Sequence, residues 1–405
     1  MTTVWIFNHY AEGPDGQATR TFDLSKRLVR SGHRVTIFAS SFSHYKLQET
    51  CLRSGQLFTD EVIDGVHFRW LRTVAYTQND LRRVLNVVSY GISAFFSGLL
   101  TRERPDIVIG VSVHPLAALV AWIVARVKRA KFYVEITDLW PEVLIQMDLL
   151  NRSHPPAVIL AWVERFLYAR AVRIFMLWPF CADHVARSGT SRDKVVWLPH
   201  VVDLQRYDGF GEYSGEVSND NFSIYYIGGH TTEYGLDVII EAAAILMPEM
   251  PTVRFVFIGG GTDKERLLRK ARELDLNNVE FRDPVPKEDI GATLWHADAF
   301  VFSRKRLPLF ESYGISNNKL CDYLAAGRPI LYTCRARNNP VEEAGAGLTI
   351  EPGDAAALAK AVRRLVQITP AQRLQMGLNG KRYARANHDA DVLAGRLADS
   401  LEISR

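Results

Sequence analysis

Short apolar runs alternate with amphipathic helical patterns along the whole chain. The runs are rich in β-branched and aromatic residues, and their alternation with helices is typical of parallel α/β units. In the first half they predict strands at residues 4–8, 34–39, 107–113, 132–137, 173–177 and 195–199. A helix is predicted at residues 17–31, where apolar residues recur at helical spacing before Gly32 ends the pattern.

The alternation lapses after Asp203 and then resumes. Residues 206–221 are polar, glycine-rich and acidic, which predicts an interdomain linker. A second series follows, with strands predicted at residues 222–227, 253–258, 279–281, 299–302 and 330–333, and a last amphipathic stretch at residues 385–401. We therefore predict an α/β protein with two doubly wound, Rossmann-like domains at residues 1–205 and 206–384, and a C-terminal helix at 385–405 that packs back on the first domain.

The size of the chain agrees with two domains. Its 405 residues exceed the roughly 250–300 residues at which a single hydrophobic core stops growing. In open α/β sheets, ligands bind beyond the carboxyl ends of the strands, so a cleft between two facing domains is the expected active site. The four cysteines are scattered without metal-ligand spacing, and the N-terminal residues carry no signal-peptide pattern. We expect reduced thiols, a cytoplasmic protein and no metal site.

Charge is distributed unevenly between the two halves. Residues 1–200 carry 24 Lys and Arg against 17 Asp and Glu, a net charge of +7, whereas the remainder has a net charge of −3. This asymmetry suggests that the first half meets something anionic. An uncharged stretch at residues 84–100 lies between Arg82-Arg83 and Arg102. It fits either a helix lying on an anionic membrane surface or a buried core helix with charged ends.

Three glycine-containing loops follow predicted strands. They contain Gly13 and Gly16, Gly228 and Gly229, and residues 259–261. Glycine lets backbone N–H groups approach a phosphate, but it also serves tight strand-to-helix turns, and both interpretations stay open. None of the loops has the spacing of a dinucleotide fingerprint or a P-loop, which argues against a dehydrogenase and an NTPase. The basic excess is small and has no accompanying motif, so nucleic-acid binding is not expected.

Residues 303–329 are the most informative segment. They begin at the end of a predicted strand with the basic cluster 304–306, and enter a helix for which Ser316 is the expected N-cap. Lys319 and Asp322 lie one turn apart on that helix and therefore share a face. A lysine at a helix N-terminus suits a diphosphate, and a carboxylate one turn on suits ribose hydroxyls. The alternative is a surface ion pair between the two side chains.

Five segments resemble family-4 GT-B glycosyltransferases, in particular the bacterial O-antigen and capsule branch similar to the L-fucosamine transferases. They are residues 8–40, 81–93, 136–146, 255–267 and 313–330, of which DLWPE and YGISNNKLCDYLAAGRPI are the most specific. The resemblance implies a retaining hexosyl transfer, without metal or other cofactor, from a UDP-type nucleotide sugar bound by the second domain. It implies a polyprenyl-diphosphate-linked acceptor on the first domain, in lipopolysaccharide, O-antigen or capsule synthesis. The +7 charge of the first half and the arginine-flanked stretch 84–100 motivate peripheral contact with the anionic inner face of the plasma membrane.

Two family motifs are altered in this chain. The second acid of the family's Glu-x7-Glu motif matches Asp322, but Gly314 stands where the first acid is expected, and Glu311 is the nearest acid. The Arg and Lys that the family places after the first strand of the second domain are absent from residues 228–235. Arg304, Lys319, or Arg20 from the first domain are the candidates to replace their charge at the leaving diphosphate.

The resulting assignments fall into three groups. As catalytic residues we expect Asp138, Glu311 and Lys319. As donor-binding residues we expect Gly228, Gly229, His230, Arg304, Tyr313, Gly314, Ile315, Asn318, Lys319 and Asp322. As acceptor-binding residues we expect His9, Gly16, Arg20 and His114.

Several alternatives remain open. Asp138 fits either a base that acts on the acceptor hydroxyl or the N-cap of the helix after Trp140. His9 and His114 fit either substrate contacts or hydrogen-bonded structural roles. For the whole chain, a sugar-nucleotide epimerase or a non-catalytic nucleotide-binding subunit would have the same architecture. The oligomeric state, the sugar and the acceptor are not predicted.

Overall fold

The computed structural model describes residues 1–78, 80–210, 213–216 and 221–404. The chain forms two compact units, Met1–Pro199 with Ala390–Arg405, and His200–Asp389. Both are open, mainly parallel sheets with helices, so the predicted fold class of two Rossmann-like domains is confirmed.

The first unit is built on an eight-stranded sheet with the order β10-β9-β8-β7-β1-β2-β6-β5. All neighbouring strands are parallel except the edge strand β5, which is antiparallel to β6. The strands are β1 (Thr3–Phe7), β2 (Arg34–Ser40), β5 (Phe58–Ile63), β6 (Val66–Leu71), β7 (Ile107–Ser112), β8 (Lys131–Ile136), β9 (Ile174–Met176) and β10 (Val195–Trp197), and β3 (Phe42–Ser43) pairs separately with β4 (Gln48–Glu49). Strands β1 and β7 are buried along their whole length, as central strands of parallel sheets are.

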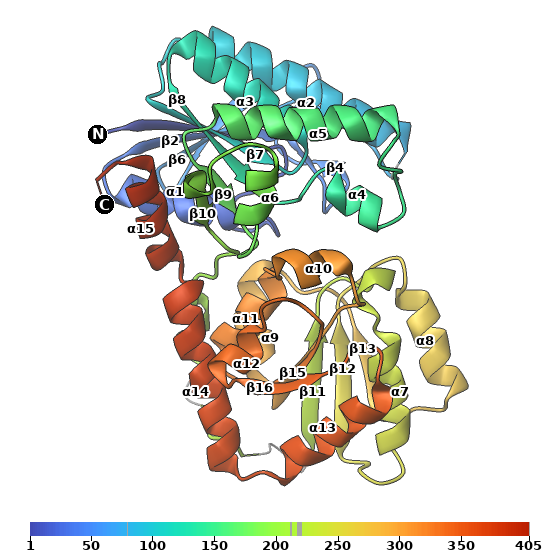
Figure 1. Ribbon diagram of the computed structural model, residues 1–405. Coiled ribbons are helices and arrows are strands. Elements are labelled where there is room, and N and C mark those ends of the chain that lie inside the picture. Colours follow the sequence, from blue (N-terminus) through green and yellow to red (C-terminus); the bar gives the residue numbers. More distant parts are fainter. Residues whose placement is uncertain (79, 211–212, 217–220, 405) are drawn as a thin grey trace. The chain divides into compact units, whose positions relative to one another are not determined.

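The helices of the first unit are α1 (Arg20–Arg30), α2 (Leu81–Leu100), α3 (Pro115–Lys128), α4 (Glu142–Gln146), α5 (Pro155–Arg170), α6 (Ala182–Arg187) and α15 (Ala390–Leu401). Helices α2, α3 and α5 lie side by side as one layer (Figure 1). Gly110 in β7 lets α3 approach closely, because a Cβ there would lie 2.7 Å from the Cα of Ala118. Helix α15 packs against α1, where Arg27 forms an ion pair of 2.8 Å with Asp391.

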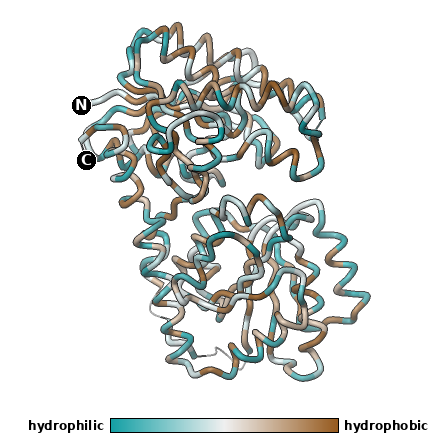
Figure 2. The backbone as a smooth tube through the Cα atoms, in the orientation of Figure 1, coloured by the Kyte–Doolittle hydropathy of each residue, from teal (hydrophilic) through white to brown (hydrophobic). Residues whose placement is uncertain are grey.

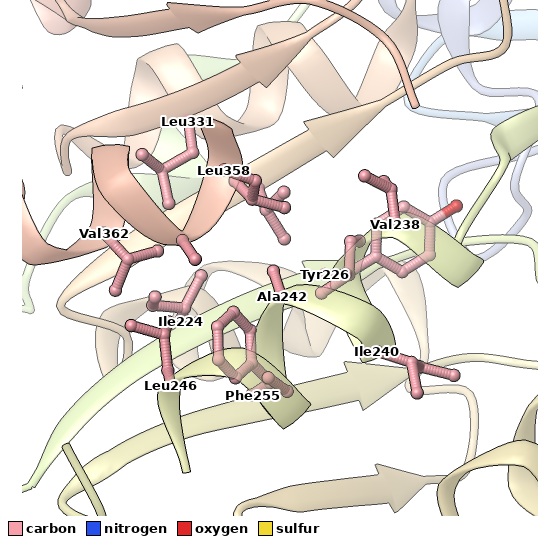
Figure 3. Packing of buried hydrophobic residues seen from close by; sticks show 14 of the residues in the cluster. Ile224, Tyr226, Val238, Ile240, Ala242, Leu246, Phe255, Leu331, Leu358 and Val362 are labelled. Atoms are coloured by element: carbon pink, nitrogen blue, oxygen red, sulfur yellow. The ribbon is translucent and has the colours of Figure 1, made fainter. Parts of the chain in front are cut away.

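The second unit is built on a six-stranded parallel sheet with the order β13-β12-β11-β14-β15-β16. The strands are β11 (Phe222–Ile227), β12 (Val253–Ile258), β13 (Val279–Arg282), β14 (Ala299–Ser303), β15 (Ile330–Thr333) and β16 (Gly347–Ile350). The helices are α7 (Asp237–Leu246), α8 (Lys264–Glu273), α9 (Ile290–Trp295), α10 (Pro308–Tyr313), α11 (Asn318–Ala326), α12 (Pro340–Ala344), α13 (Ala355–Gln367) and α14 (Pro370–Asn387). Figure 3 shows part of the core, where Ile224 and Phe255 of the sheet meet Leu246, Leu358 and Val362 of α7 and α13.

Each sheet has one point at which the strand order reverses. In the first unit the chain proceeds from β1 to β2 on one side and from β7 to β8 on the other, so the reversal lies between β1 and β7. In the second unit it lies between β11 and β14. Ligands of open α/β sheets bind at the carboxyl ends of the strands beside such a reversal. The loops that follow these four strands are therefore the expected ligand-binding positions.

The structure corrects three local predictions. Helix α11 has Asn317 as its N-cap, whose side chain accepts the N–H of Lys319, whereas Ser316 accepts the N–H of His200. The stretch 385–401 is divided between α14 and α15 by the residues 388–389. The chain leaves the first unit after Pro199, so the described part of the predicted linker 206–221 belongs to the second unit; its residues 211–212 and 217–220 lie outside the described residues.

Candidate functional site

Lys319 lies against the glycine loop that follows β11. Gly228 has a φ of 136°, and a Cβ there would lie 2.7 Å from the Nζ of Lys319. The Nζ donates a hydrogen bond of 2.7 Å to the hydroxyl of Tyr226 and lies 3.4 Å from the ring centroid of Tyr234. The backbone conformation therefore favours glycine at position 228, and the missing Cβ leaves room for the amine of the lysine.

The charge of Lys319 is poorly compensated. Within the described ranges, no carboxylate forms an ion pair with its ammonium group. Burial lowers the pKa of Lys319 well below its usual range, and the nearby charge of Arg304 lowers it further. Both effects destabilise the charged form of Lys319, because the ammonium group has no anionic partner. An anionic ligand at this position would therefore bind favourably.

Arg304 follows β14 and shares an aromatic partner with Lys319. Its guanidinium lies 4.4 Å from the ring centroid of Tyr234 and 5.3 Å from that of Phe310. Glu233 lies 3.7 Å away, and the buried Nε has no hydrogen-bond partner. Lys319 and Arg304 therefore bring two positive charges to one ring, and Glu233 forms an ion pair with Arg304. This arrangement has the chemistry of a site for a phosphate or diphosphate.

The two acids of this segment have separate partners. Asp322 accepts a hydrogen bond of 2.7 Å from the hydroxyl of Tyr207 and forms an ion pair of 3.1 Å with Lys287. Lys319 and Asp322 thus do not form the surface ion pair that their spacing allowed. Glu311 forms an ion pair of 2.6 Å with Arg306, which lowers the pKa of the Glu311 carboxyl.

The turn between α10 and α11 is held by a buried amide. Gly314 has a φ of 84°, and its N–H donates to the carbonyl of Phe310. Asn338 accepts the N–H of Ile315 at 2.6 Å and donates to the carbonyl of Ile315 at 3.0 Å. The N–H groups of Gly314 and Ile315 are therefore both engaged by hydrogen bonds within the protein. Tyr313 beside the turn is buried, whereas Asn318 at the start of α11 is exposed.

His230 is packed beneath the same loop. Its side chain is fully buried near the rings of Tyr226, Phe257 and Phe281, and neither ring nitrogen has a hydrogen-bond partner. Burial lowers the pKa of His230 to about 4, so the ring is neutral at pH 7. Its backbone N–H donates to Gly260, and the carbonyl of Gly229 accepts the hydroxyl of Tyr226. The glycines at 228–229 and 259–261 are thus explained by the close packing of these two loops against each other.

In the first unit, His9 and His114 meet at the reversal between β1 and β7. The Nδ1 of His9 lies 2.7 Å from the Nε2 of His114, and the His9 ring stacks on Tyr10 and Tyr90. The Nδ1 of His114 accepts the N–H of Ala117 as the N-cap of α3, so the proton of the neutral ring resides on Nε2. It is donated to the Nδ1 of His9, which leaves the His9 proton on Nε2.

Both histidines are neutral at pH 7. Burial is the main cause that lowers the pKa of His9, followed by His114, and burial lowers the pKa of His114 to about 3. A side-chain hydrogen bond between His9 and the buried Asn86 partly offsets this lowering of the His9 pKa.

A cavity of about 310 Å³ opens beside His9. Tyr10, Phe42, His44 and Trp70 give it aromatic walls. Polar lining comes from Glu12, Asp15, Gly16, Ser43, Lys46 and Glu61, among others. Two of the residues expected to contact the acceptor, His9 and Gly16, thus line one cavity. His114 does not line it but forms a hydrogen bond with His9.

Arg20 and Asp138 differ in their surroundings. The guanidinium of Arg20 contacts Glu135 and donates to the carbonyls of Leu198 and Pro199, so these contacts are internal to the first unit. Asp138, which follows β8, is an exposed residue. Pro141 occupies the N-cap position of α4, which excludes the N-cap interpretation of Asp138.

Some participants were not predicted from the sequence. Tyr226 and Tyr234 reside in a strand and a short 3₁₀ helix (Thr232–Tyr234) whose patterns indicated only structure. Asn338 and Lys287 are distant in sequence from the partners that they hold. No group of three or more His, Cys, Asp or Glu side chains in the part of the chain that the structure describes is arranged to hold a metal ion.

Comparisons with known proteins identify both units. Residues 15–200 match the model of the glycosyl transferase 4-like domain, and residues 221–367 match that of glycosyl transferases group 1. WcaI of Escherichia coli (strain K12), described as a putative colanic acid biosynthesis glycosyl transferase, is 21% identical over 370 residues, which cover 88% of this chain and 90% of WcaI.

Solved structures resemble the chain over its whole length. Sucrose-phosphate synthase from Thermosynechococcus elongatus has a TM-score of 0.76 at 15% identity, covering 99% of this chain and 98% of that one. HepE of Anabaena, in complex with UDP and glucose, has a TM-score of 0.67 at 14% identity, covering 99% of both chains. WaaG, a glycosyltransferase involved in lipopolysaccharide biosynthesis, has a TM-score of 0.64 at 16% identity, covering 99% of both chains. With two matching domain models and this fold throughout, the chain belongs to the family-4 glycosyltransferases of the GT-B fold.

Proposed function

We propose that the protein transfers a hexosyl group, with retention of anomeric configuration and without a metal, from a UDP-sugar to a lipid-linked sugar in surface polysaccharide synthesis. Binding of the donor is supported by two cationic side chains, Lys319 and Arg304, that lie over the ring of Tyr234. Lys319 has no ion-pair partner in the described ranges, and Arg304 has a buried, unpartnered Nε. A diphosphate would supply the acceptor oxygens that both side chains lack.

The same pair can replace the Arg and Lys missing from residues 228–235. When the bond between the sugar C1 and the diphosphate oxygen breaks, negative charge develops on the leaving phosphate. Lys319 and Arg304 would stabilise that charge from fixed positions, and such electrostatic stabilisation accounts for most of the rate enhancement of many enzymes. The acceptor oxygen would form the new bond to C1 while its proton passes to the departing phosphate oxygen. Retention by this route requires no protein nucleophile.

Asp322 would bind the ribose of the nucleotide. Its carboxylate accepts from Tyr207 and Lys287, and a carboxylate has about four acceptor positions, so room remains for ribose hydroxyls. UDP is the nucleotide proposed because the structurally similar HepE was solved with UDP. Glu311, bound to Arg306 and Arg335, would act by fixing the loop that carries Arg304.

The donor site is tested by calorimetric titration of UDP into Lys319→Met and into the control Lys360→Met, which removes an exposed lysine of α13. We expect Lys319→Met to weaken UDP binding roughly ten- to hundredfold, as for the loss of a charge-assisted hydrogen bond. Equal affinities of the two variants would refute the placement of the diphosphate. Release of an epimerised nucleotide sugar in the absence of an acceptor would instead indicate an epimerase. Tight UDP binding without any sugar transfer would indicate a non-catalytic subunit.

The lipid-linked acceptor is supported by an apolar face on α2. Its residues recur three or four positions apart and are each at least 42% exposed: Leu81, Val84, Leu85, Val88, Ile92, Phe96 and Leu100. By length and composition α2 could cross a membrane, with a mean hydropathy of 1.3 and 28% of the window buried. However, Tyr90 and Gly91 of α2 are buried against β2 and α3, so the helix is built into the first unit.

Neighbouring elements extend this face. Val158, Ile159 and Trp162 of α5 are exposed, and Phe166 contacts both Trp162 and Trp122 of α3. Figure 2 shows apolar residues along the helices of this layer. Exposed arginines border it at positions 82, 102, 104, 126, 129 and 165. Apolar residues ringed by arginines fit the surface of an anionic membrane, which would present the lipid-linked acceptor on the cytoplasmic side.

Vesicle flotation tests this part of the proposal. The protein should float with vesicles containing phosphatidylglycerol, and less with pure phosphatidylcholine. Phe96→Asp should abolish flotation, whereas Leu378→Asp, on an exposed apolar residue of α14, should leave it unchanged. Equal flotation of the two variants would exclude α2 as the contact.

A further inference from the structure

A carboxylate lies beside the two cations that share the ring of Tyr234. Glu233, the residue before this tyrosine, has a carboxylate oxygen 3.7 Å from a guanidinium nitrogen of Arg304. Burial and the charge of Arg304 lower the pKa of Lys319, and the charge of Glu233 raises it in part. Glu233 therefore offsets some of the positive charge at the position where we place the diphosphate.

The contact between Glu233 and Arg304 is loose. Its 3.7 Å exceeds the roughly 2.7–2.9 Å of a charge-assisted hydrogen bond. The Glu233 side chain is 51% exposed, and its carboxylate makes no hydrogen bond with another residue in the part of the chain that the structure describes. A half-exposed carboxylate at this distance holds a cation weakly, because water solvates it well without the contact.

The backbone that carries Glu233 is held more firmly than its side chain. The carbonyl of Glu233 accepts the N–H of Lys305 at 3.0 Å, and the carbonyl of Tyr234 accepts the hydroxyl of Ser303 at 2.7 Å. Gly235 then ends the short helix with a φ of 59°, and a Cβ there would lie 3.0 Å from the Cγ of Lys305. A ligand at Arg304 would therefore meet a movable side chain on a loop that is tied to the end of β14.

A diphosphate would bind Arg304 better than Glu233 does. The buried Nε of Arg304 has no hydrogen-bond partner among the described residues, so the guanidinium has donors to offer. A phosphate can accept two parallel N–H groups of a guanidinium at short distance. The phosphate and the Glu233 carboxylate would also repel each other if both stayed beside Arg304. The two anions would therefore compete for one guanidinium.

We propose that Glu233 is a displaceable counterion of Arg304, which limits the affinity of the donor site for nucleoside diphosphates and so favours release of the nucleotide after transfer. The inference rests on the proposed function, because it places the donor diphosphate at Lys319 and Arg304. In the empty site the Glu233 carboxylate reduces the repulsion between the two cations. The arriving diphosphate takes over this role, and the carboxylate is released to solvent. Its return to Arg304 after the transfer offsets part of the free energy that holds UDP.

Calorimetric titration of UDP into the full chain tests this with Glu233→Gln, which keeps the size of the side chain and removes its charge. We expect this variant to bind UDP about three- to tenfold more tightly than the unmodified protein. A residue with a merely structural role would not give a gain in affinity when it is substituted. The control Glu273→Gln replaces an exposed glutamate at the end of α8 and should leave the affinity unchanged. Equal affinities of the two variants, or weaker binding by Glu233→Gln, would overturn the proposal.

A double-mutant cycle with Arg304→Met separates competition from simple repulsion. If Glu233 acts by occupying the guanidinium, Glu233→Gln should improve UDP binding by less than about twofold in the Arg304→Met background. A gain of the same size in both backgrounds would overturn the proposal, because the carboxylate would then repel UDP without holding Arg304.

The same titrations distinguish a failure of this proposal from a failure of the donor site. UDP binding that is weakened by Lys319→Met but unaffected by Glu233→Gln would refute the counterion alone. UDP binding that neither Lys319→Met nor Arg304→Met weakens would refute the donor site and the counterion with it.

Discussion

Acidification should destabilise the first unit through His114. In the folded chain burial lowers the pKa of this histidine to about 3, whereas an unfolded histidine titrates near 6.5. Below pH 6.5, His114 is therefore protonated in the unfolded chain but stays neutral in the folded chain. The stability that depends on a neutral His114 is present in full above pH 6.5 and is lost as the pH falls towards 3. Between pH 7 and pH 5 the loss amounts to about 2 kcal/mol.

The substitution His114→Asn isolates this contribution. Asparagine is a good N-cap and can still accept the N–H of Ala117, but it does not titrate. The variant should be less stable than the unmodified protein at pH 7, because His9 loses its partner. That difference in free energy of unfolding should shrink by about 2 kcal/mol at pH 5, since only the unmodified protein has this histidine to protonate.

Urea unfolding followed by tryptophan fluorescence, at constant ionic strength and at pH 7, 6 and 5, measures the difference. The transition to compare is the one that the substitution shifts, because two units need not unfold together. The control His67→Asn replaces an exposed histidine of β6 and should give a difference that is independent of pH within about 0.5 kcal/mol. Parallel pH curves for His114→Asn and the unmodified protein would refute the assignment of a buried neutral ring.

Three more outcomes are expected. Asn338→Leu should lower the free energy of unfolding of the second unit by about 1–3 kcal/mol, because it leaves the buried N–H and carbonyl of Ile315 unpaired. Urea unfolding measures this change, and an unchanged midpoint would show that the two hydrogen bonds of Asn338 do not stabilise the turn. Gly110→Ala should cost about 1–3 kcal/mol by forcing α3 from the sheet, seen as a lower thermal midpoint, whereas Gly260→Ala should leave the midpoint unchanged, because a Cβ there would meet its nearest neighbour, Pro284, at an ordinary 3.5 Å. UDP affinity should fall as NaCl rises from about 50 to 500 mM, and this dependence should be shallower in Lys319→Met if that lysine meets the diphosphate.

Much of the fold could be predicted from apolar periodicity, because buried parallel strands are continuous apolar runs. The strands at 222–227, 253–258 and 330–333 were predicted with the observed bounds. The edge strand β5 was missed, since its residues FTDEVI are mostly exposed and carry no apolar run. Asn317 instead of Ser316 caps α11 because both are good caps, and the choice depends on His200 far away in sequence.

The candidate site was predictable in position but not in its contacts. Strand ends at the sheet reversals located His9, His114, Gly228 and Arg304, since topology alone brings such loops together. Periodicity could not show that Lys319 turns towards Tyr234 rather than Asp322, because that direction depends on space left by Gly228. The pairing of His9 with His114 depends on the tautomer that the cap of α3 imposes. The assigned roles of these residues stay predictions.

Helix α15 has a consequence for how the protein can be divided. The chain passes from one unit to the other after Pro199 and returns after Asp389, so the units are joined by two peptide connections. A protease that cut only one of them would produce two polypeptides, and after a cut at the first connection residues 200–405 would still be held to the first unit by the packing of α15 against α1. A C-terminal truncation at residue 389 would damage the N-terminal unit, since it strips α1 of the partner that holds Arg27. Sequence halves of this protein are not its folding units, and the first unit could be produced alone only as a fusion of both chain ends.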